Sequence, residues 1–288
     1  MNTQLKGLLI TTLGVLCVVP DALFIRLIEA DAMTVAFWRS LLCGLIVLSG
    51  LLIRYGRQTP AQFMAIGGWG VVYAFFAAVS SILFVTSVKL TTVANTTIII
   101  ASMPVFAALI SWLALGERLS RRMFWTIALV FAGLLVIGYG SINEHSDNNG
   151  ASLAGDLAAL AVSLFFAIAL TAARKARSQS MIPALPLAYI PCALLLLPFV
   201  DPLSIPHSQW WLVALHGGFF IALSSCLLAL GPRYISSAEV ALLILLESIL
   251  APLLVWMAVG EQVGYWTLVG GGLVLGVLCI SNFLALRH

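Results

Sequence analysis

The chain has 288 residues, of which 62% are hydrophobic and only 9% are charged, and its formal net charge is +3. Soluble domains carry about 25% charged residues, so this composition excludes a soluble globular protein and places the chain in a lipid bilayer. The small positive charge gives no reason to expect a nucleic-acid partner.

A helix that spans a bilayer needs about 20 mostly apolar residues. The sequence can be divided into ten such runs, so we predict an all-α integral membrane protein with ten transmembrane helices. The longest polar interval, 141–152, is predicted to link a first unit, 1–140, to a second unit, 153–288. In chain order the ten runs cover roughly residues 6–27, 33–54, 63–88, 92–115, 121–140, 153–176, 181–200, 208–231, 237–259 and 264–285.

One stretch of the chain occurs twice, because residues 75–117 align without a gap with residues 219–261. An internal repeat of this kind indicates a duplicated architecture. With five helices in each copy, an odd number, the second copy must enter the membrane in the opposite sense, so we predict two inverted repeats. The matched positions include Phe75-Phe76 with Phe219-Phe220, Ser80-Ser81 with Ser224-Ser225, Trp112 with Trp256, and Gly116-Glu117 with Gly260-Glu261.

The basic residues are distributed unequally between the loops on the two sides of the membrane. Short cytoplasmic loops accumulate Lys and Arg. If the amino terminus is cytoplasmic, 11 of the 14 basic residues lie on the cytoplasmic side. Of the others, Arg26 and Lys89 lie on the outer side, and Arg39 lies within a helix. We therefore expect both termini to be cytoplasmic.

The first two predicted helices carry two ionisable residues at similar depth. Pro20 predicts a bend in the first helix, because proline removes a backbone donor. Asp21 in the first helix and Arg39 in the second each lie about 9 Å from the outer helix end, at 1.5 Å per residue. An ionisable residue inside a membrane usually finds a partner. The two are expected either to form a structural ion pair or to belong to an outer gate.

The third run places Tyr73, Phe76 and Ser80 on one helix face by their spacing of three and four residues. The repeat places Phe220 and Ser224 on the equivalent face of the eighth run. Such faces fit a pocket wall and fit close helix packing through serine equally well. Of the eight tryptophans, Trp69 alone is predicted to lie far enough from a helix end to be considered for a pocket. In the fourth run, Pro104 near mid-membrane predicts a broken or kinked helix.

In the second half, Phe166 is a candidate cavity residue, with simple core or lipid contact as the alternative. Glu247 is predicted near mid-membrane, where an unpaired charged carboxylate costs at least about 2.5 kcal/mol, so it must be protonated, paired or facing water. His216 is predicted at comparable depth, and either the two form a relay or His216 bonds a backbone carbonyl or a serine. The repeat aligns Glu247 with Met103, so this part of the architecture is not twofold symmetric.

Sequence signatures of catalysis are missing from the chain. It has no HExxH, GxSxG or phosphate-loop motif, which argues against a membrane protease or lipase. The five cysteines show no metal-ligand spacing and are interpreted as free thiols. We therefore predict no catalytic residues, no metal site and no cofactor, and we expect the protein not to be an enzyme.

The pattern also resembles a known family. Arg39 in the second helix, the run from Ala94 through Pro104 to Trp112, Gly116, Glu117 and Leu119, and its echo at Ala238, Glu247, Ser248, Trp256, Gly260 and Glu261 are similar to the paired EamA-type domains of the drug/metabolite transporter (DMT) superfamily. Within it, the helix 1 sequence VVPDALFIRLI is most like that of the bacterial aromatic-amino-acid exporters of the YddG type. The resemblance implies a bacterial inner-membrane exporter. Its central cavity would be walled by helices 1, 3, 4, 6, 8 and 9, with helices 5 and 10 at the periphery.

These observations lead to one expected function: export of aromatic and other apolar amino acids by alternating access between the two repeats. The expected partners are an amino acid, the lipid bilayer and, as candidate coupling ions, protons, and the protein is expected to be a monomer or a homodimer. A permease for another small metabolite or drug, and a membrane-embedded enzyme or non-transporting subunit, are the alternatives. The candidate substrate-binding residues are Tyr73, Phe76, Ser80, Met103, Phe166, His216, Phe220, Ser224 and Glu247, and the candidate gate or ion pair is Asp21 with Arg39.

Overall fold

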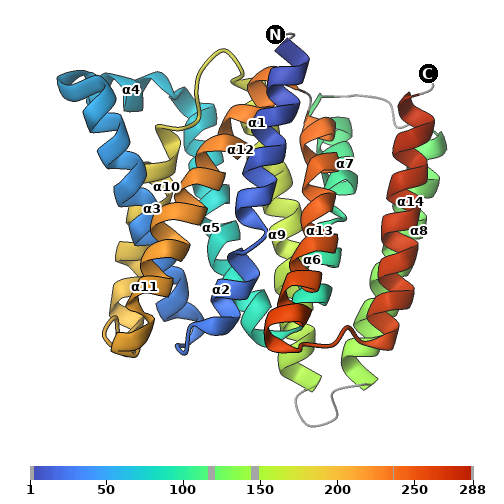
Figure 1. Cartoon of the computed structure of the whole chain (residues 1–288). Coiled ribbons are helices and arrows are strands. Elements are labelled where there is room, and N and C mark those ends of the chain that lie inside the picture. Colours follow the sequence, from blue (N-terminus) through green and yellow to red (C-terminus); the bar gives the residue numbers. More distant parts are fainter. Residues whose placement is uncertain (1–2, 116–120, 144–148, 236, 287–288) are drawn as a thin grey trace.

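The computed structural model describes residues 3–115, 121–143, 149–235 and 237–286. In these residues the secondary structure is helical and contains no strand. The long helices run roughly side by side across the molecule, and α1 begins at the same end of the bundle at which α14 ends (Figure 1). We refer to this end as the terminal end and to the other as the distal end.

The first half of the chain contains eight α-helices. They are α1 (Thr3–Val18), α2 (Asp21–Leu27), α3 (Ala32–Tyr55), α4 (Thr59–Ala65), α5 (Gly67–Leu90), α6 (Val93–Ile100), α7 (Met103–Leu115) and α8 (Arg121–Asn143). The second half contains α9 (Asn149–Lys175), α10 (Ala184–Leu196), α11 (Trp210–Val213), the π-helix η4 (Ala214–Ile221), α12 (Ala222–Tyr234), α13 (Ser237–Val259) and α14 (Tyr265–Leu286).

Six helical stretches of the described chain are long and apolar enough to cross a membrane: Gln4–Leu27, Ala32–Ala65, Gly67–Leu90, Val93–Ile110, Ser152–Lys175 and His207–Tyr234. Four shorter apolar helices accompany them: Phe124–Gly140, Ala184–Phe199, Leu243–Val259 and Tyr265–Ile280. The prediction of an all-α protein that crosses the membrane several times is confirmed. The number of ten complete spans stays a prediction.

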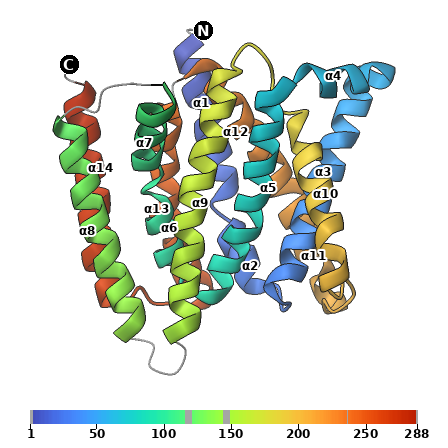
Figure 2. The same ribbon diagram turned by 180° about the vertical axis from the view of Figure 1, so that it is seen from behind.

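The two halves of the chain run through the bundle in opposite senses. Helix α1 begins at the terminal end, whereas α9 begins at the distal end, close to where α8 finishes (Figures 1 and 2). This is the arrangement expected of inverted repeats. Two parts of the predicted organisation, Gly116-Glu117 at the end of the first copy and residues 144–148 of the linker, lie outside the described residues.

The bend predicted at Pro20 and the broken or kinked helix predicted at Pro104 both occur as interruptions of the helix. Helix α1 ends at Val18 and α2 begins at Asp21, after Pro20. Helix α6 ends at Ile100 and α7 begins at Met103, next to Pro104. A broken helix leaves carbonyl groups that must find donors in the absence of water.

Serine hydroxyls supply the missing donors at the α6–α7 break. The Ile99 carbonyl accepts hydrogen bonds from Ser102 Oγ at 2.6 Å and from Ser163 Oγ of α9 at 3.0 Å. The Thr97 carbonyl accepts one from Ser248 Oγ of α13 at 2.8 Å. Serines of both repeats therefore hold the break in place.

The third predicted helix begins later than the sequence suggests. Helix α4 ends at Ala65, and α5 begins at Gly67 with φ +61°, a left-handed conformation that is readily adopted only by glycine. Trp69 consequently lies in the first turn of α5, where it is 46% exposed and has Lys175 Nζ 4.6 Å from its ring centroid. The prediction that Trp69 lies far from a helix end is therefore wrong.

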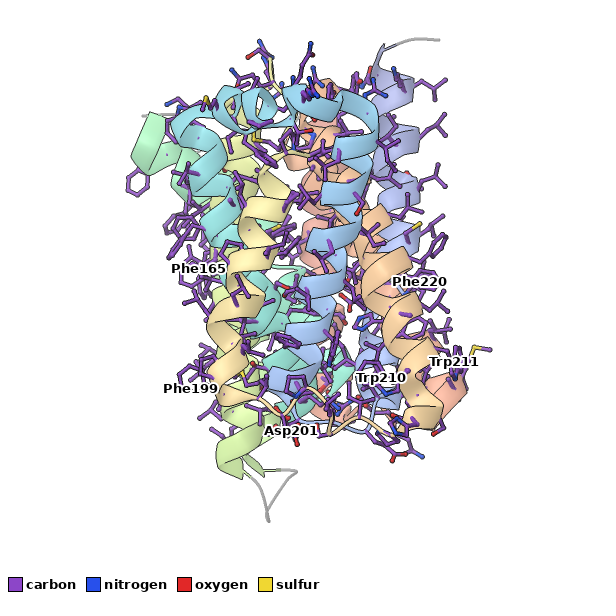
Figure 3. The ribbon with its side chains drawn as sticks, turned by 90° about the vertical axis from the view of Figure 1, so that its left-hand side faces the viewer. Phe165, Phe199, Asp201, Trp210, Trp211 and Phe220 are labelled. Atoms are coloured by element: carbon purple, nitrogen blue, oxygen red, sulfur yellow. The ribbon has the colours of Figure 1, made fainter. Side chains whose placement is uncertain are left out.

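Tryptophan side chains gather at the distal end. Figure 3 shows Trp210 and Trp211 there, not far from Asp201. Trp38 packs edge-on against Trp210, with ring centroids 5.0 Å apart, and donates a hydrogen bond to the Pro202 carbonyl at 2.9 Å. An aromatic side chain with a polar tip suits the membrane–water interface.

Helices α8 and α14 pack against each other at one edge of the bundle (Figure 2). Their contact depends on glycine. A Cβ atom added at Gly270 would lie 2.6 Å from the Gly133 carbonyl oxygen and 2.7 Å from Ile137. Small residues of this kind let helix backbones approach closely in membranes.

We expect Gly270→Leu to destabilise the α8–α14 pair by about 1–3 kcal/mol or more, because overpacking forces the backbones apart. Thermal unfolding of the purified protein in detergent measures the effect. Gly272→Leu is the matched control, because a Cβ atom at Gly272 meets nothing within 4 Å. Equal melting temperatures for the two variants would contradict the importance of this contact.

Candidate functional site

A cavity of about 100 Å³ lies inside the bundle, among helices of both repeats. It is large enough for a few water molecules or a small solute. Among the described residues, α8 and α14 contribute none of its lining. The lining residues are Val18, Asp21, Arg39, Ala77, Ser80, Ser81, Phe84, Ile100, Met103, Val162, Phe166, Tyr189, Ser224, Ser225, Leu228, Ile244 and Glu247.

The repeat relates ten of these lining residues to one another in pairs. Each pair is separated by the constant offset that aligns the two copies, so the cavity lies where equivalent faces of the two repeats meet. Secondary transporters built from inverted repeats bind substrate at such an interface, near the bilayer midplane. The pairs are Ser80 with Ser224, Ser81 with Ser225, Phe84 with Leu228, Ile100 with Ile244, and Met103 with Glu247.

The break between α6 and α7 borders this cavity. Ile100 is the last residue of α6 and Met103 the first of α7, and both line the cavity. The equivalent segment of the second repeat, in α13, is a continuous helix. The two repeats therefore differ in backbone as well as in side chain at this point.

A buried ion pair forms one wall of the cavity. Arg39 Nη2 lies 2.5 Å from Asp21 Oδ2, and Arg39 Nε donates to Asp21 Oδ1 at 3.1 Å. Arg39 Nη1 also donates to Ser81 Oγ. The guanidinium carbon lies 5.7 Å from the ring centroid of Phe84. Asp21 is 1% exposed and Arg39 8%, so each charge depends on the other.

His216 completes this group from the second repeat. Its Nε2 lies 2.6 Å from Asp21 Oδ1, and its ring stacks on Phe24 with centroids 5.4 Å apart. His216 belongs to the π-helix η4, and such segments often occur at functional sites. The hypothesis of a His216–Glu247 relay is not supported, because the histidine is bonded to Asp21, the predicted partner of Arg39.

Two polar groups in the cavity form no hydrogen bond or ion pair that the described part of the chain shows. Ser80 Oγ is buried and makes no hydrogen bond there. Glu247 of α13 lines the same cavity. It takes part in none of the ion pairs between described residues, which are Arg26 with Glu261, Asp21 with Arg39, and Asp21 with His216. Buried polar groups are normally satisfied by protein, water or ligand. These two are therefore the groups that a ligand can satisfy.

The structure brings together most, but not all, of the candidate site residues. Ser80, Met103, Phe166, Ser224 and Glu247 line the cavity, as do Asp21 and Arg39. The lining does not include the candidates Tyr73, Phe76, His216 and Phe220. Phe76 packs against Phe165, with centroids 5.5 Å apart, and Phe220 against Phe24, at 5.3 Å.

Several residues that line the cavity are not among the candidates predicted from the sequence. Ser81 and Ser225 were recognised as matched positions of the repeat but not as cavity residues, and the same offset points to Phe84 with Leu228 and to Ile100 with Ile244. Tyr189 of α10 had no such signal, because it lies outside the repeated stretch. The repeat therefore carried more information about the site than single polar residues did.

Glu261 joins the two repeats at the distal end through an ion pair and a hydrogen bond, and two further hydrogen bonds lie within the first repeat there. Arg26 Nε lies 2.8 Å from Glu261 Oε2, and Arg26 Nη2 donates to the Thr91 carbonyl at 2.6 Å. The Val93 amide donates to Glu261 Oε1 at 2.7 Å. Lys89 Nζ donates to the Ile28 carbonyl at 2.9 Å. Arg26 and Lys89, the basic residues expected on the outer side, thus have local partners.

The described residues contain no group of three or more His, Cys, Asp or Glu side chains that would hold a metal ion. The cavity lining consists of apolar walls, four serines, Tyr189, the buried Asp21–Arg39 ion pair and a second carboxylate, Glu247. A helical membrane protein with such a cavity between two repeats has the architecture of a secondary transporter.

Comparison with known proteins gives the family. The model of the EamA-like transporter family matches residues 5–139 and again residues 153–283. The chain belongs to the EamA-like transporter family, and it is accordingly a membrane transporter of the drug/metabolite type rather than an enzyme. No curated protein matches the sequence.

One solved structure, titled only "Crystal structure of protein", is similar over nearly the whole chain. Its TM-score is 0.68 at 18% sequence identity, and the match covers 99% of this chain and 100% of that one. At this identity the similarity shows the fold alone.

Proposed function

We propose that the protein exports amino acids with aromatic or other apolar side chains across the bacterial inner membrane. The observation that carries this proposal is that Ser80 Oγ has no hydrogen bond and Glu247 no ion pair with a described residue, in a cavity with otherwise mainly apolar walls. A carboxylate without a cationic partner suits the ammonium group of an amino acid. Phe84 and Phe166 line the same cavity and suit an apolar side chain.

The proposed mechanism is alternating access, in which the two repeats rock about the cavity. The distal contacts of Arg26, Lys89 and Glu261 must then separate when the cavity opens at that end. We propose that this end faces the periplasm and that both termini are cytoplasmic, because 11 of the 14 basic residues then lie on the cytoplasmic side. A cavity of about 100 Å³ must widen to admit an aromatic side chain.

Counterflow in liposomes tests the proposal. Purified protein is reconstituted in vesicles preloaded with unlabelled phenylalanine, and uptake of labelled phenylalanine is followed. We expect transient accumulation that leucine competes for and that glutamate does not, because the cavity already holds carboxylates. Protein-free vesicles are the control. Transport of another metabolite without any amino acid exchange would replace this substrate class by another within the same transporter family.

A further inference from the structure

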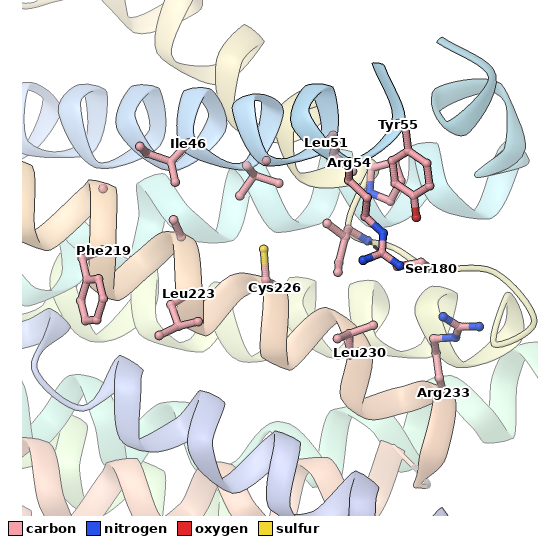
Figure 4. A pocket seen from close by; sticks show the side chains of 16 residues that line it. Ile46, Leu51, Arg54, Tyr55, Ser180, Phe219, Leu223, Cys226, Leu230 and Arg233 are labelled. Carbon is pink, nitrogen blue, oxygen red and sulfur yellow. Dashed lines mark hydrogen bonds between the residues drawn. The ribbon is translucent and has the colours of Figure 1, made fainter. Parts of the chain in front are cut away.

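A second hollow lies outside the cavity between the repeats. It is a cleft of about 590 Å³ between α3 and the η4–α12 helix, and residues 180–183 before α10 contribute to it. None of its lining residues lines the central cavity. Figure 4 shows Arg54 and Arg233 at one end of the cleft and Phe219 towards the other.

The cleft has the length of one membrane leaflet. From Phe219 to Arg233 the helix advances 14 residues, or about 20 Å. Half of a bilayer's hydrocarbon core is about 15 Å thick, with a headgroup layer beyond it. Arg233 and Arg54 lie near the terminal end of the bundle, whereas Phe219 lies near the middle of the stretch His207–Tyr234. The cleft therefore runs from the headgroup level of one leaflet towards the midplane.

The walls of the cleft are apolar and face outward. Ile46, Phe219 and Leu223 are 51%, 53% and 39% exposed. Two glycines keep the space open. A Cβ atom added at Gly50 would meet nothing within 4 Å, and one added at Gly218 would meet only Ile46, at 3.9 Å. A straight acyl chain fits such a surface.

The charge at the terminal end of the cleft is positive and uncompensated. Arg54 and Arg233 line it, and no acidic residue of the described chain does. Within the described residues, Arg233 makes only long hydrogen bonds, at 3.4 and 3.5 Å, to the carbonyls of Arg177 and Ser178. Arg54 lies over the Tyr55 ring at 5.6 Å. Neither arginine forms an ion pair with a described residue, so both can bind an external phosphate, which arginine does well.

We propose that this cleft binds an anionic phospholipid of the leaflet at the terminal end. One acyl chain lies along Ile46, Leu223 and Phe219, and the headgroup phosphate sits between Arg54 and Arg233. Basic pockets between transmembrane helices are suited to such headgroups. Because α3 also carries Arg39 and α12 carries Ser224 and Ser225, the lipid would separate or brace two helices that line the central cavity. Lipid binding in this cleft does not depend on which substrate the protein transports.

Lipid binding to the purified, delipidated protein in detergent tests whether the two arginines bind the lipid headgroup. Phosphatidylglycerol and phosphatidylcholine with the same acyl chains are titrated, and bound lipid is counted by native mass spectrometry. We expect the protein to prefer phosphatidylglycerol. We expect the double variant Arg54→Gln/Arg233→Gln to weaken phosphatidylglycerol binding about 30-fold, because each substitution removes one charged contact with the headgroup. Arg57→Gln, at a neighbouring exposed residue outside the cleft, should bind like the unmodified protein.

A second pair of variants tests whether an acyl chain lies in the cleft, without changing the charge of the protein. Gly50→Leu fills the cleft and should also weaken phosphatidylglycerol binding, whereas Gly272→Leu, on exposed α14, should not. Equal binding of the two lipids, unchanged binding by the double arginine variant, or unchanged binding by Gly50→Leu would each overturn the proposal. Full competition by inorganic phosphate would also overturn it, since the site would then bind an anion rather than a lipid.

Discussion

Replacing Arg39 by glutamine is expected to lower the free energy of unfolding by about 3–5 kcal/mol, because removal of one partner leaves a buried charge uncompensated. Asp21, 1% exposed, would retain only His216 at 2.6 Å and would lose both contacts with the guanidinium group. Transport should be lost as well, because the same pair forms one wall of the central cavity.

A double-mutant cycle separates the pair from a general effect of substitution. The four proteins are the unmodified chain, Asp21→Asn, Arg39→Gln and the double variant, and each is melted in the same detergent. The double variant should lose much less than the sum of the single changes, because neither charge then remains buried alone. Arg57→Gln, at an exposed site, is the matched control. Additive losses would mean that the two residues stabilise the bundle independently.

Much of the site follows from the repeat, and the reason is geometric. Equivalent faces of two inverted copies meet at the axis that relates them, so matched positions such as Ser80 with Ser224 and Met103 with Glu247 approach the same space. The prolines at positions 20 and 104 located the helix breaks for an equally physical reason, since proline cannot continue the hydrogen-bond ladder. Asp21 and Arg39 could be paired from their depth because few residues in the membrane are ionisable.

The candidate residues that do not line the cavity were chosen from helix faces and depth. Tyr73 lies on the same face of α5 as Ala77 and Ser80, but one turn nearer the terminal end than Ala77, and there it belongs to an apolar cluster with Leu185 and Met181 and does not line the cavity. Spacing predicts a face but not how far a cavity extends along it. Phe220 and Ser224 lie on either side of the transition from η4 to α12. The wider π turn shifts side chains that the α-helical period would align.

A bilayer removes the pattern that identifies buried faces in soluble helices. There, the polar side of an amphipathic helix marks solvent, whereas a membrane helix is apolar all round. Phe219, 53% exposed, and its neighbour Phe220, packed on Phe24, cannot be told apart by composition. The neighbours that decide between them, such as Phe24 in α2, come from distant parts of the chain.

Replacing Glu247 by glutamine is expected to reduce amino acid exchange roughly 100-fold, as loss of a charged contact to a buried ligand cation typically does. The reason is that Glu247 is the one cavity carboxylate that forms no ion pair with a described residue, since Asp21 is bound by Arg39 and His216. Glutamine keeps the size of the side chain and its ability to accept hydrogen bonds, so folding should be little affected.

Counterflow at several pH values measures both consequences of this change. The rate should fall, and if this carboxylate carries the coupling proton the pH dependence of exchange should disappear with it. Glu29→Gln is the matched control, because Glu29 is exposed at the distal end and outside the cavity. A Glu247→Gln variant with unchanged rate and unchanged pH response would remove the residue from the mechanism. Ser80 and the Asp21–Arg39 pair would then be the groups left to bind a polar substrate, and a neutral ligand would fit them better than an amino acid.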